Sequence, residues 1–230
     1  MSTFILGAIG TAQAAATPEQ KCQQAKLKAQ GKLAGCLAKN TAGVIGGKED
    51  AEATCRTKFA TALQKADDKA AAAEPPTSCR YLANGDGTVS DLNTGLMWEQ
   101  KTGILGTPNP SDIHDINNTY SWSAGVGGGT MRDGTAFTGF LATLNNDTAS
   151  TNGVNAAITG CFAGHCDWHM PSVAEGWTIA PIDPILGPDV GYWSASSWSA
   201  DSSGTSALYL FGLGANKSTL FPVIAVRGGL

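Results

Sequence analysis

The segment CFAGHCDWHMPSVAE, residues 161–175, gathers side chains that could bind a metal ion or act as a nucleophile. Its sulfur and imidazole groups belong to Cys161, His165, Cys166 and His169. Zinc in proteins is held by thiolate sulfur and imidazole nitrogen. A thiolate beside a histidine is also a common enzymatic nucleophile. A disulfide between the two cysteines is the third alternative, and it would make the segment a structural loop.

The disulfide between Cys161 and Cys166 is the favoured alternative. Gly164 lies between the two cysteines and disfavours the helix that would align His165 with His169 for zinc. The chain has six cysteines, an even number that is typical of exported proteins. We therefore expect a closed loop that leads to a buried Trp168, with zinc or thiolate chemistry as the alternatives.

The N-terminus agrees with export. A short apolar run is followed by Ala12-Gln13-Ala14, which resembles a signal-peptidase cleavage site, although the run has no basic residues before it. We interpret residues 1–16 as the remnant of a secretory signal. The protein is then expected to be secreted, periplasmic or located at the cell surface.

Two helices are predicted next, over residues 17–42 and 49–74. Thr17, Pro18, Glu19 and Gln20 open the first with the pattern of a capping box and a proline in the first helical position. Both segments are rich in helix-forming Ala, Leu, Lys and Gln. Two prolines at positions 75–76 end the second helix, so an antiparallel helical hairpin is expected.

The cysteine positions fit this hairpin. Cys36 lies late in the first predicted helix and Cys55 early in the second, while Cys22 and Cys79 both lie at the open end. The four cysteines can be paired in more than one way. The nested one, Cys36–Cys55 with Cys22–Cys79, suits a hairpin best, and free buried thiols are the alternative.

The charges divide the chain into two regions. Residues 1–75 hold ten of the fifteen Lys and Arg but seven of the nineteen Asp and Glu, so this part is near +3 and the remainder near −7. We place a hairpin domain at 17–78 and a second domain at 79–230. The net charge of −4 argues against nucleic acid and anionic membranes as partners, and nothing else is apolar enough to insert in a bilayer.

The second region changes to Gly, Ser, Thr and Asn with turn pairs such as Asn84-Gly85. Residues 79–100 have the pattern of a β-hairpin. Residues 133–146 have one apolar helical face, formed by Phe137, Phe140, Leu141 and Leu144. Further strands are expected in 191–198, 206–214 and 221–230, with a short helix after Pro171. The fold class is therefore α+β, with few helices, short strands and long loops.

This region resembles a known bacterial family. The motifs occur in the family's order: RYLANGDGTVSDLNTGLMWEQK, HDINNTYSW, DGTAFTGFLATLN, CFAGHCDWHMPSVAE, IDPILGP, YWSAS and IAVRGGL. They are similar to DUF1566 domains, also called Lcl C-terminal-like domains after a collagen-like adhesin. The resemblance covers residues 80–230. It implies a C-type lectin-like fold, an exported or surface-displayed binding module, sugar or glycosaminoglycan binding as in the namesake adhesin, and no catalytic residues.

Several positions depart from the family. His169-Met170 replaces the usual Arg-Leu before Pro171, which removes a planar charged donor. Residues 198–221 lack the family's acidic and Asn-rich pattern. A ligand mode that uses these positions does not transfer.

The ligand site is expected between residues 194 and 221. Small polar residues there surround separate aromatics, a composition typical of adaptable binding surfaces. We expect Trp198 and Tyr209 to contact a ligand, with Asn216 and Lys217 as hydrogen-bonding partners at the edge. The alternative is that such aromatics face the core, as we expect of Trp193.

Two polar clusters are weaker metal candidates. Asn84, Asp86 and Thr88 with Asp91 bring oxygens together, but the glycine and glutamate of an EF-hand loop are absent, so a hairpin turn is favoured over calcium. Asp112, His114 and Asp115 are expected to be solvated rather than metal-bound.

The sequence thus predicts a non-enzymatic, exported binding module that is adhesin-like, with a glycan or surface polymer as ligand and no cofactor. The first alternative is a structural protein that assembles into an extracellular homo-oligomer or layer. The second is a zinc-dependent enzyme that uses the four Cys and His side chains of the opening segment.

Overall fold

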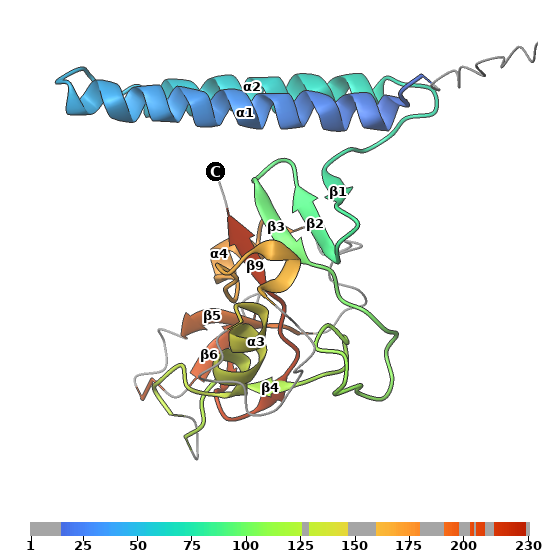
Figure 1. Cartoon of the computed structure of the whole chain (residues 1–230), viewed down its shortest axis with the longest axis vertical. Helices are drawn as coiled ribbons and strands as arrows, with labels where there is room; N and C mark the ends of the chain where they lie inside the picture. The colour runs from blue at the N-terminus through green and yellow to red at the C-terminus, as the bar shows by residue number, and fades with distance from the viewer. Residues whose placement is uncertain are drawn as a thin grey trace, which may run out of the picture. The chain divides into compact units, whose positions relative to one another are not determined.

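The structure, a computed structural model, describes residues 15–125, 129–146, 160–179, 191–197, 203–204, 206–209 and 214–228. The chain divides into two compact units, Met1–Cys79 and Arg80–Leu230 (Figure 1). Most of the predicted signal remnant, residues 1–14, lies outside the described residues. In the part that is described, no helix is both long and apolar enough to cross a membrane.

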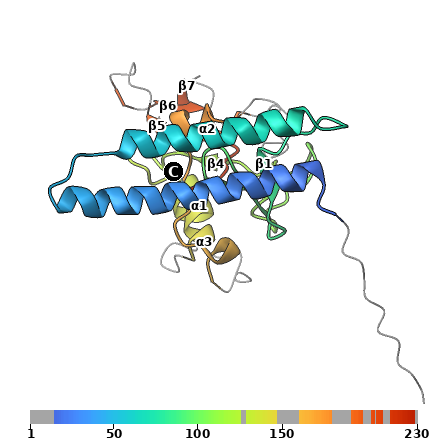
Figure 2. The ribbon, with the colours of Figure 1, turned by 90° about the horizontal axis from the view of Figure 1, so that it is seen from above.

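The first unit is the predicted helical hairpin. Helix α1, Pro18–Ile45, and helix α2, Glu52–Ala71, lie side by side in both views (Figures 1 and 2). The capping box forms between Thr17 and Gln20: the Thr17 hydroxyl accepts from the Gln20 amide at 3.1 Å, and the Gln20 side chain accepts from the Thr17 amide at 2.9 Å. Helix α1 continues three residues beyond its predicted end at 42.

The seam between the helices has coiled-coil spacing. The buried residues of α1 are Cys22, Lys26, Ala29 and Leu33, at intervals of four, three and four residues, as in a heptad repeat. Lys26 is fully buried, and its ammonium lies 2.6 Å from the carboxylate of Asp67 on α2. This ion pair therefore links the two helices across the seam.

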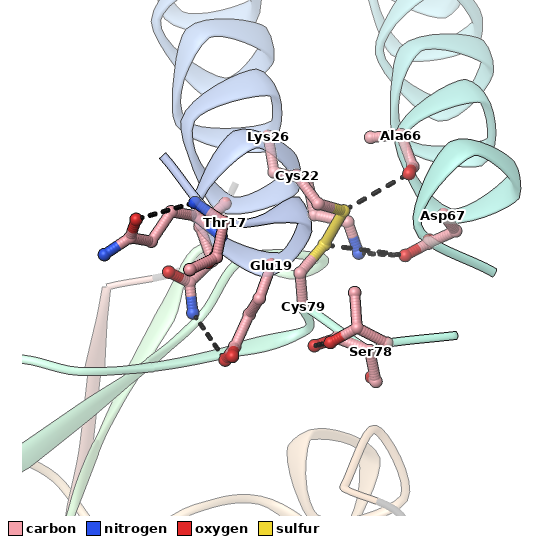
Figure 3. Close-up of a disulfide and its surroundings, with 11 residues drawn as sticks. Thr17, Glu19, Cys22, Lys26, Ala66, Asp67, Ser78 and Cys79 are labelled. Carbon is pink, nitrogen blue, oxygen red and sulfur yellow. Dashed lines mark hydrogen bonds and ion pairs between the residues drawn. A yellow bond between two sulfur atoms is a disulfide. The ribbon is translucent and has the colours of Figure 1, made fainter. Parts of the chain in front are cut away.

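Two disulfides close the hairpin with the pairing that the spacing predicted. Cys36–Cys55 clamps the turn end, with a Cα–Cα distance of 5.8 Å. Cys22–Cys79 clamps the open end, with a Cα–Cα distance of 5.9 Å (Figure 3). Both distances are typical of disulfides.

The second unit is α+β, as predicted. Its strands are short: β1 Tyr81–Ala83, β2 Thr88–Asp91, β3 Leu96–Glu99, β4 Tyr120–Ser121, β5 Trp193–Ser197, β6 Ser206–Tyr209, β7 Gly214–Asn216, β8 Leu220–Phe221 and β9 Val226–Gly228. They form antiparallel sheets in the orders β1-β2-β3-β9, β4-β8 and β5-β6-β7. Strand β9, close to the C-terminus, pairs with β3 and so ties the end of the unit to its beginning.

The helical parts of this unit are brief. They are the π-helical η1 Ala136–Leu141, α3 Ala142–Leu144, the 3-10 turn η2 Phe162–Gly164 and α4 Val173–Gly176. The predicted apolar face of residues 133–146 is real, since Phe140 and Leu144 are fully buried. The backbone differs from the expected α-helix because its first part has π-type hydrogen bonding.

The core of the second unit is built on tryptophan. One cluster contains Trp122, Trp168 and Trp193. A second cluster, under the sheet β1-β2-β3-β9, contains Trp98 and Tyr192. Trp168 and Trp193 are thus core residues, as expected, and the buried rings fix the loops and short strands that surround them.

Candidate ligand-binding surface

The predicted ligand site coincides with the three-stranded sheet β5-β6-β7. Asn216 ends β7 and is exposed, with its side-chain oxygen accepting from the Ser218 amide at 3.0 Å and hydroxyl at 2.7 Å. Of Tyr209, only the backbone position is described, opposite Trp193 in the pairing of β6 with β5. Trp198 lies outside the described residues. The structure therefore brings Tyr209 and Asn216 to one sheet.

Lys217 is placed differently from the expectation. It is 1% exposed, and its ammonium donates to the carbonyl of Gly204 at 2.6 Å. The same ammonium lies 4.1 Å from the centre of the Trp122 ring, a cation–π distance. The amides of Trp122 and Ser123 both donate to the Lys217 carbonyl at 2.9 Å. Lys217 thus joins the loop before β6 to the core instead of standing at the surface edge.

A second cation, Arg132, contacts the opposite edge strand of this sheet, β5. Arg132 lies over the same Trp122 ring at 5.8 Å and donates to the carbonyl of Ala195 in β5 at 2.7 Å. The Trp122 indole donates to the neighbouring carbonyl of Ser194 at 3.0 Å. Trp122 therefore holds β5 directly through its N–H and indirectly through Arg132, while Lys217 holds the loop before β6.

The opening segment forms the predicted disulfide. Cys161 and Cys166 are bonded, with a Cα–Cα distance of 5.1 Å, so neither sulfur is a thiolate. His169 pairs through its backbone with Val226 and directs its Nε2 at Glu175, 3.1 Å away. The indole of Trp168 donates to the Phe162 carbonyl at 3.0 Å. The loop that this disulfide closes therefore lies against Trp168.

Glu175 is the third residue of α4 and forms a second capping box with Ser172, the N-cap. Its carboxylate accepts from the amide and hydroxyl of Ser172, both at 2.8 Å, while its own amide donates to the Ser172 hydroxyl. Burial opposes ionisation of this carboxyl, but the hydrogen bonds from Ser172 and His169 prevail and lower its pKa. The lowered pKa favours the ionised carboxylate, which is the form that accepts the hydrogen bonds of the capping box.

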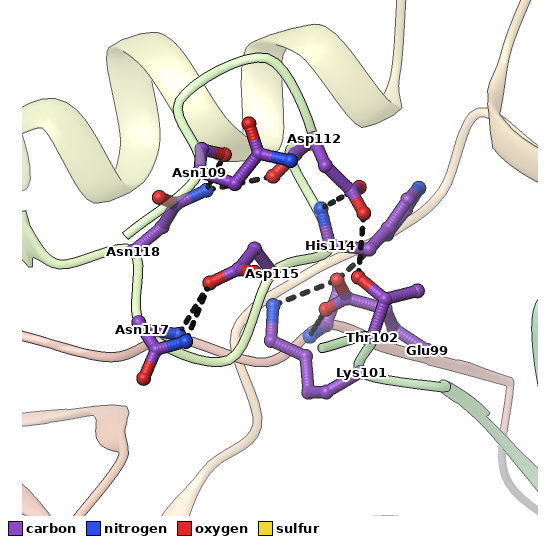
Figure 4. A network of polar contacts seen from close by, with 10 residues as sticks. Glu99, Lys101, Thr102, Asn109, Asp112, His114, Asp115, Asn117 and Asn118 are labelled. Atoms are coloured by element: carbon purple, nitrogen blue, oxygen red, sulfur yellow. Dashed lines mark hydrogen bonds and ion pairs between the residues drawn. The ribbon is translucent and has the colours of Figure 1, made fainter. Parts of the chain in front are cut away.

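A buried ionic cluster around Glu99 contacts the disulfide loop. Glu99, at the end of β3, is fully buried and accepts through Oε1 from Lys101 Nζ and His114 Nδ1, each at 2.8 Å (Figure 4). Its Oε2 accepts from the Ala225 amide at 2.9 Å. The His114 ring stacks against Phe162 of the disulfide loop at 4.4 Å. Long-range contacts create this cluster, so the sequence alone gave no sign of it.

The expectation that Asp112, His114 and Asp115 are solvated is wrong for Asp115, which is buried, whereas Asp112 and His114 are partly exposed. Asp115 is 7% exposed and accepts from the amide of Asn117 at 2.8 Å. Burial raises the pKa of Asp112, but hydrogen bonds from the Thr102 hydroxyl and the His114 amide outweigh it and lower the pKa overall. The carboxylates close the loop on itself, because each accepts backbone hydrogen bonds that the irregular chain would otherwise leave unmade.

The oxygen-rich turn between β1 and β2 is also engaged internally, as expected for a hairpin. Asp86 accepts from the amide of Thr88 at 3.1 Å and its hydroxyl at 2.6 Å. Asp91 is fully buried and forms a two-point ion pair with Arg80, at 3.1 and 2.8 Å. Arg80 also donates to the carbonyl of Thr178. Both carboxylate oxygens of Asp91 and one of Asp86 therefore accept hydrogen bonds within this unit.

Across the described ranges, one group of three metal-ligand side chains lies together, namely Cys22, Asp67 and Cys79, and both sulfurs belong to a disulfide.

Sequence reasoning missed an apolar tip at Ile104 and Leu105, which are 86% and 52% exposed. Asn117 braces this tip by donating to the Ile104 carbonyl at 2.8 Å and accepting from the Gly106 amide at 2.7 Å.

Neither family models nor curated proteins nor solved structures match the chain.

Proposed function

We propose that this protein is an exported, non-enzymatic binding module whose second unit holds a glycan or another surface polymer. Residues 194–221 form the ligand-facing part in this proposal. Trp198 and Tyr209 supply rings on which a sugar stacks, and Asn216 supplies hydrogen bonds at the edge. Lys217 takes a supporting role beneath the surface, in keeping with its burial.

The observation that carries the proposal is that all six cysteines are in disulfides. Disulfides persist in oxidising compartments outside the cytosol. The same bonds also remove the thiolates that zinc or nucleophilic chemistry at Cys161 and Cys166 would require. A binding role fits both facts.

The anchored sheet adds support. Binding surfaces gain affinity when their loops are ordered beforehand, because less entropy is lost on binding. Trp122, Arg132 and Lys217 hold β5 and the loop before β6 to the core through cation–π contacts and hydrogen bonds. We extend the proposal to the family: the second unit is a DUF1566-type domain with a C-type lectin-like fold, on the strength of the seven ordered motifs.

The test is a glycan array with the full chain, followed by titration of the best ligand. Trp198→Ala should weaken binding by about 1–3 kcal/mol and leave the melting temperature nearly unchanged, as expected of an exposed aromatic that dominates binding. Trp177→Ala is the matched control, because Trp177 is 62% exposed but lies outside the segment. Equal losses in both variants, or unfolding of Trp198→Ala, would place the ligand elsewhere.

A second candidate is a structural protein that assembles with copies of itself. The braced tip at Ile104 and Leu105 favours it, since a rigid turn that exposes two large apolar side chains is suited to docking. Light scattering over a range of concentrations should then show growth of the particle mass. Ile104→Asp should abolish that growth, whereas growth that survives this change would count against the tip.

A further inference from the structure

The open end of the helical hairpin contains an apolar cavity of about 390 Å³. On α1 its lining runs from Pro18 to Ala25, and on α2 it runs from Ala66 to Ala73 just past the helix end. In both stretches lining residues recur at intervals of three and four, so each helix presents one face to the cavity. The cavity is therefore the open side of the helical seam, over a length of about 10 Å at 1.5 Å per residue.

Small side chains explain why this space stays open. Most of the lining residues are alanine, which has no atoms beyond Cβ to fill the gap. Cys22, which lines the cavity, is bonded to Cys79, and its sulfur lies 3.2 Å from the Ala66 carbonyl of α2 (Figure 3). The result resembles the concave, largely apolar sites that bind small molecules, which are commonly about 300–1,000 Å³.

Charge at the cavity has one sign. Of the described residues that line it, only Lys21 and Lys69 are charged, one on each helix, and both are exposed. The nearby carboxylate of Asp67 is engaged by the buried Lys26 at 2.6 Å. Because α1 begins and α2 ends here, the partial charges of the two helix ends offset each other. The two ammonium groups therefore favour an anionic group at the mouth.

We propose that this cavity binds a medium-chain fatty acid. The alkyl chain lies along the alanine-lined seam and the carboxylate meets Lys21 and Lys69. The lined stretch of about 10 Å suits an alkyl chain of medium length, such as that of decanoate. This site lies in the first unit and is independent of the polymer-binding surface proposed for the second.

Isothermal calorimetry of decanoate against the full chain, below the micelle concentration, tests the site. We expect saturable binding of one decanoate per chain. Ala25→Leu, which fills the cavity with a good helix former at an exposed position, should reduce the affinity at least tenfold. Ala34→Leu is the matched control, since Ala34 is exposed on the same helix away from the cavity, and it should leave the affinity unchanged.

The charge requirement has its own variants. The double change Lys21→Gln, Lys69→Gln should weaken decanoate about threefold to tenfold, as expected for two exposed ion pairs. The control Lys32→Gln, Lys58→Gln alters two exposed lysines outside the cavity and should have no effect. Decanol should bind more weakly than decanoate to the unmodified chain.

Three results would overturn the inference. They are no saturable decanoate binding, binding that Ala25→Leu leaves intact, and equal affinities for decanol and decanoate that the lysine changes do not alter. Absence of decanoate binding together with a dimer that Ala25→Leu dissociates would instead identify a second copy of the chain as the occupant. Loss of glycan binding in Trp198→Ala with normal decanoate binding would show that the two sites are separate.

Discussion

Removing the negative charge of Glu99 should destabilise the second unit strongly. Glu99→Gln keeps the size of the side chain and an oxygen acceptor for the Ala225 amide. It leaves the Lys101 ammonium, whose side chain is 3% exposed, without its carboxylate partner at 2.8 Å. The half-buried ring of His114 loses the same partner. The change therefore isolates the effect of charge from that of packing.

The size of the expected loss of stability follows from the burial of the ion pair between Glu99 and Lys101. Breaking a buried ion pair by removing one partner costs about 3–5 kcal/mol, because the other charge is left in a poorly solvated place. The Lys101 ammonium keeps one compensation, since it lies 4.8 Å from the centre of the Phe140 ring. We therefore expect about 3 kcal/mol for Glu99→Gln, at the lower end of that range. Lys101→Met should cost a similar amount.

The double variant, Glu99→Gln with Lys101→Met, should be more stable than the sum of the single changes implies. It removes both charges and leaves neither unpaired. A coupling of about 2 kcal/mol or more is expected from the double-mutant cycle. If Glu99→Gln alone unfolds the unit, the double variant should restore a folded state.

Urea denaturation of the full chain followed by tryptophan emission measures these values for the second unit alone, because all six tryptophans lie between residues 98 and 198. Circular dichroism at the helical minimum follows mainly α1 and α2, and its transition should not move. A cost below about 1 kcal/mol for Glu99→Gln, or single changes that add within about 0.5 kcal/mol, would refute the argument.

Three further predictions concern the disulfides and charges. Replacing Cys36 and Cys55 with alanine should destabilise the hairpin by about 3 kcal/mol in thermal unfolding followed by circular dichroism, since the bond closes a loop with a sequence separation of 19; an unchanged transition would contradict this. Arg227 lowers the pKa of Asp167 chiefly by hydrogen bonding, so the pair stabilises the folded state above the unfolded pKa of about 3.9 and loses this effect as pH falls. Asp167→Asn should therefore cost up to about 1 kcal/mol at pH 7, since solvent screens the exposed Asp167, and progressively less as the pH falls through the folded-state pKa. A cost that stays constant on acidification would refute the argument. Elemental analysis should find no stoichiometric zinc, and about one zinc per chain that is lost in His169→Ala would revive the enzyme alternative.

The helical hairpin was predictable because its signals are local. The capping box at Thr17 marks the start of α1, and the hairpin makes one cysteine pairing natural. The predicted end of the second helix at residue 74 is wrong, because α2 ends at Ala71, three residues earlier. The start of α2 was misplaced by three residues for a non-local reason. The Asn40 side chain, from the other helix, accepts from the Ala51 amide at 2.7 Å, and Asp50 accepts from the Glu52 amide at 2.8 Å. These bonds delay the helix until Glu52.

The candidate site was predictable only in part. Alternating aromatics and turn residues located the strands β5, β6 and β9, and the burial of Trp193 followed from strand alternation. The burial of Lys217 did not follow, because it depends on Trp122, which is about a hundred residues away in the chain. The Glu99 cluster was not predicted for the same reason, because His114 and Ala225 contact Glu99 from loops that are distant in the sequence. A sequence shows which residues are polar, but tertiary contacts decide which polar residues are buried.

The nested disulfides of the hairpin determine how the chain responds to proteases. A single peptide-bond cleavage anywhere between Cys22 and Cys79 leaves both fragments joined by Cys22–Cys79. A cut in the turn between the helices is bridged a second time by Cys36–Cys55. The two units would thus stay attached after nicking, until a reductant acts or a cut falls beyond Cys79. In a protease-rich extracellular setting, a damaged hairpin would remain covalently linked to the domain that it precedes.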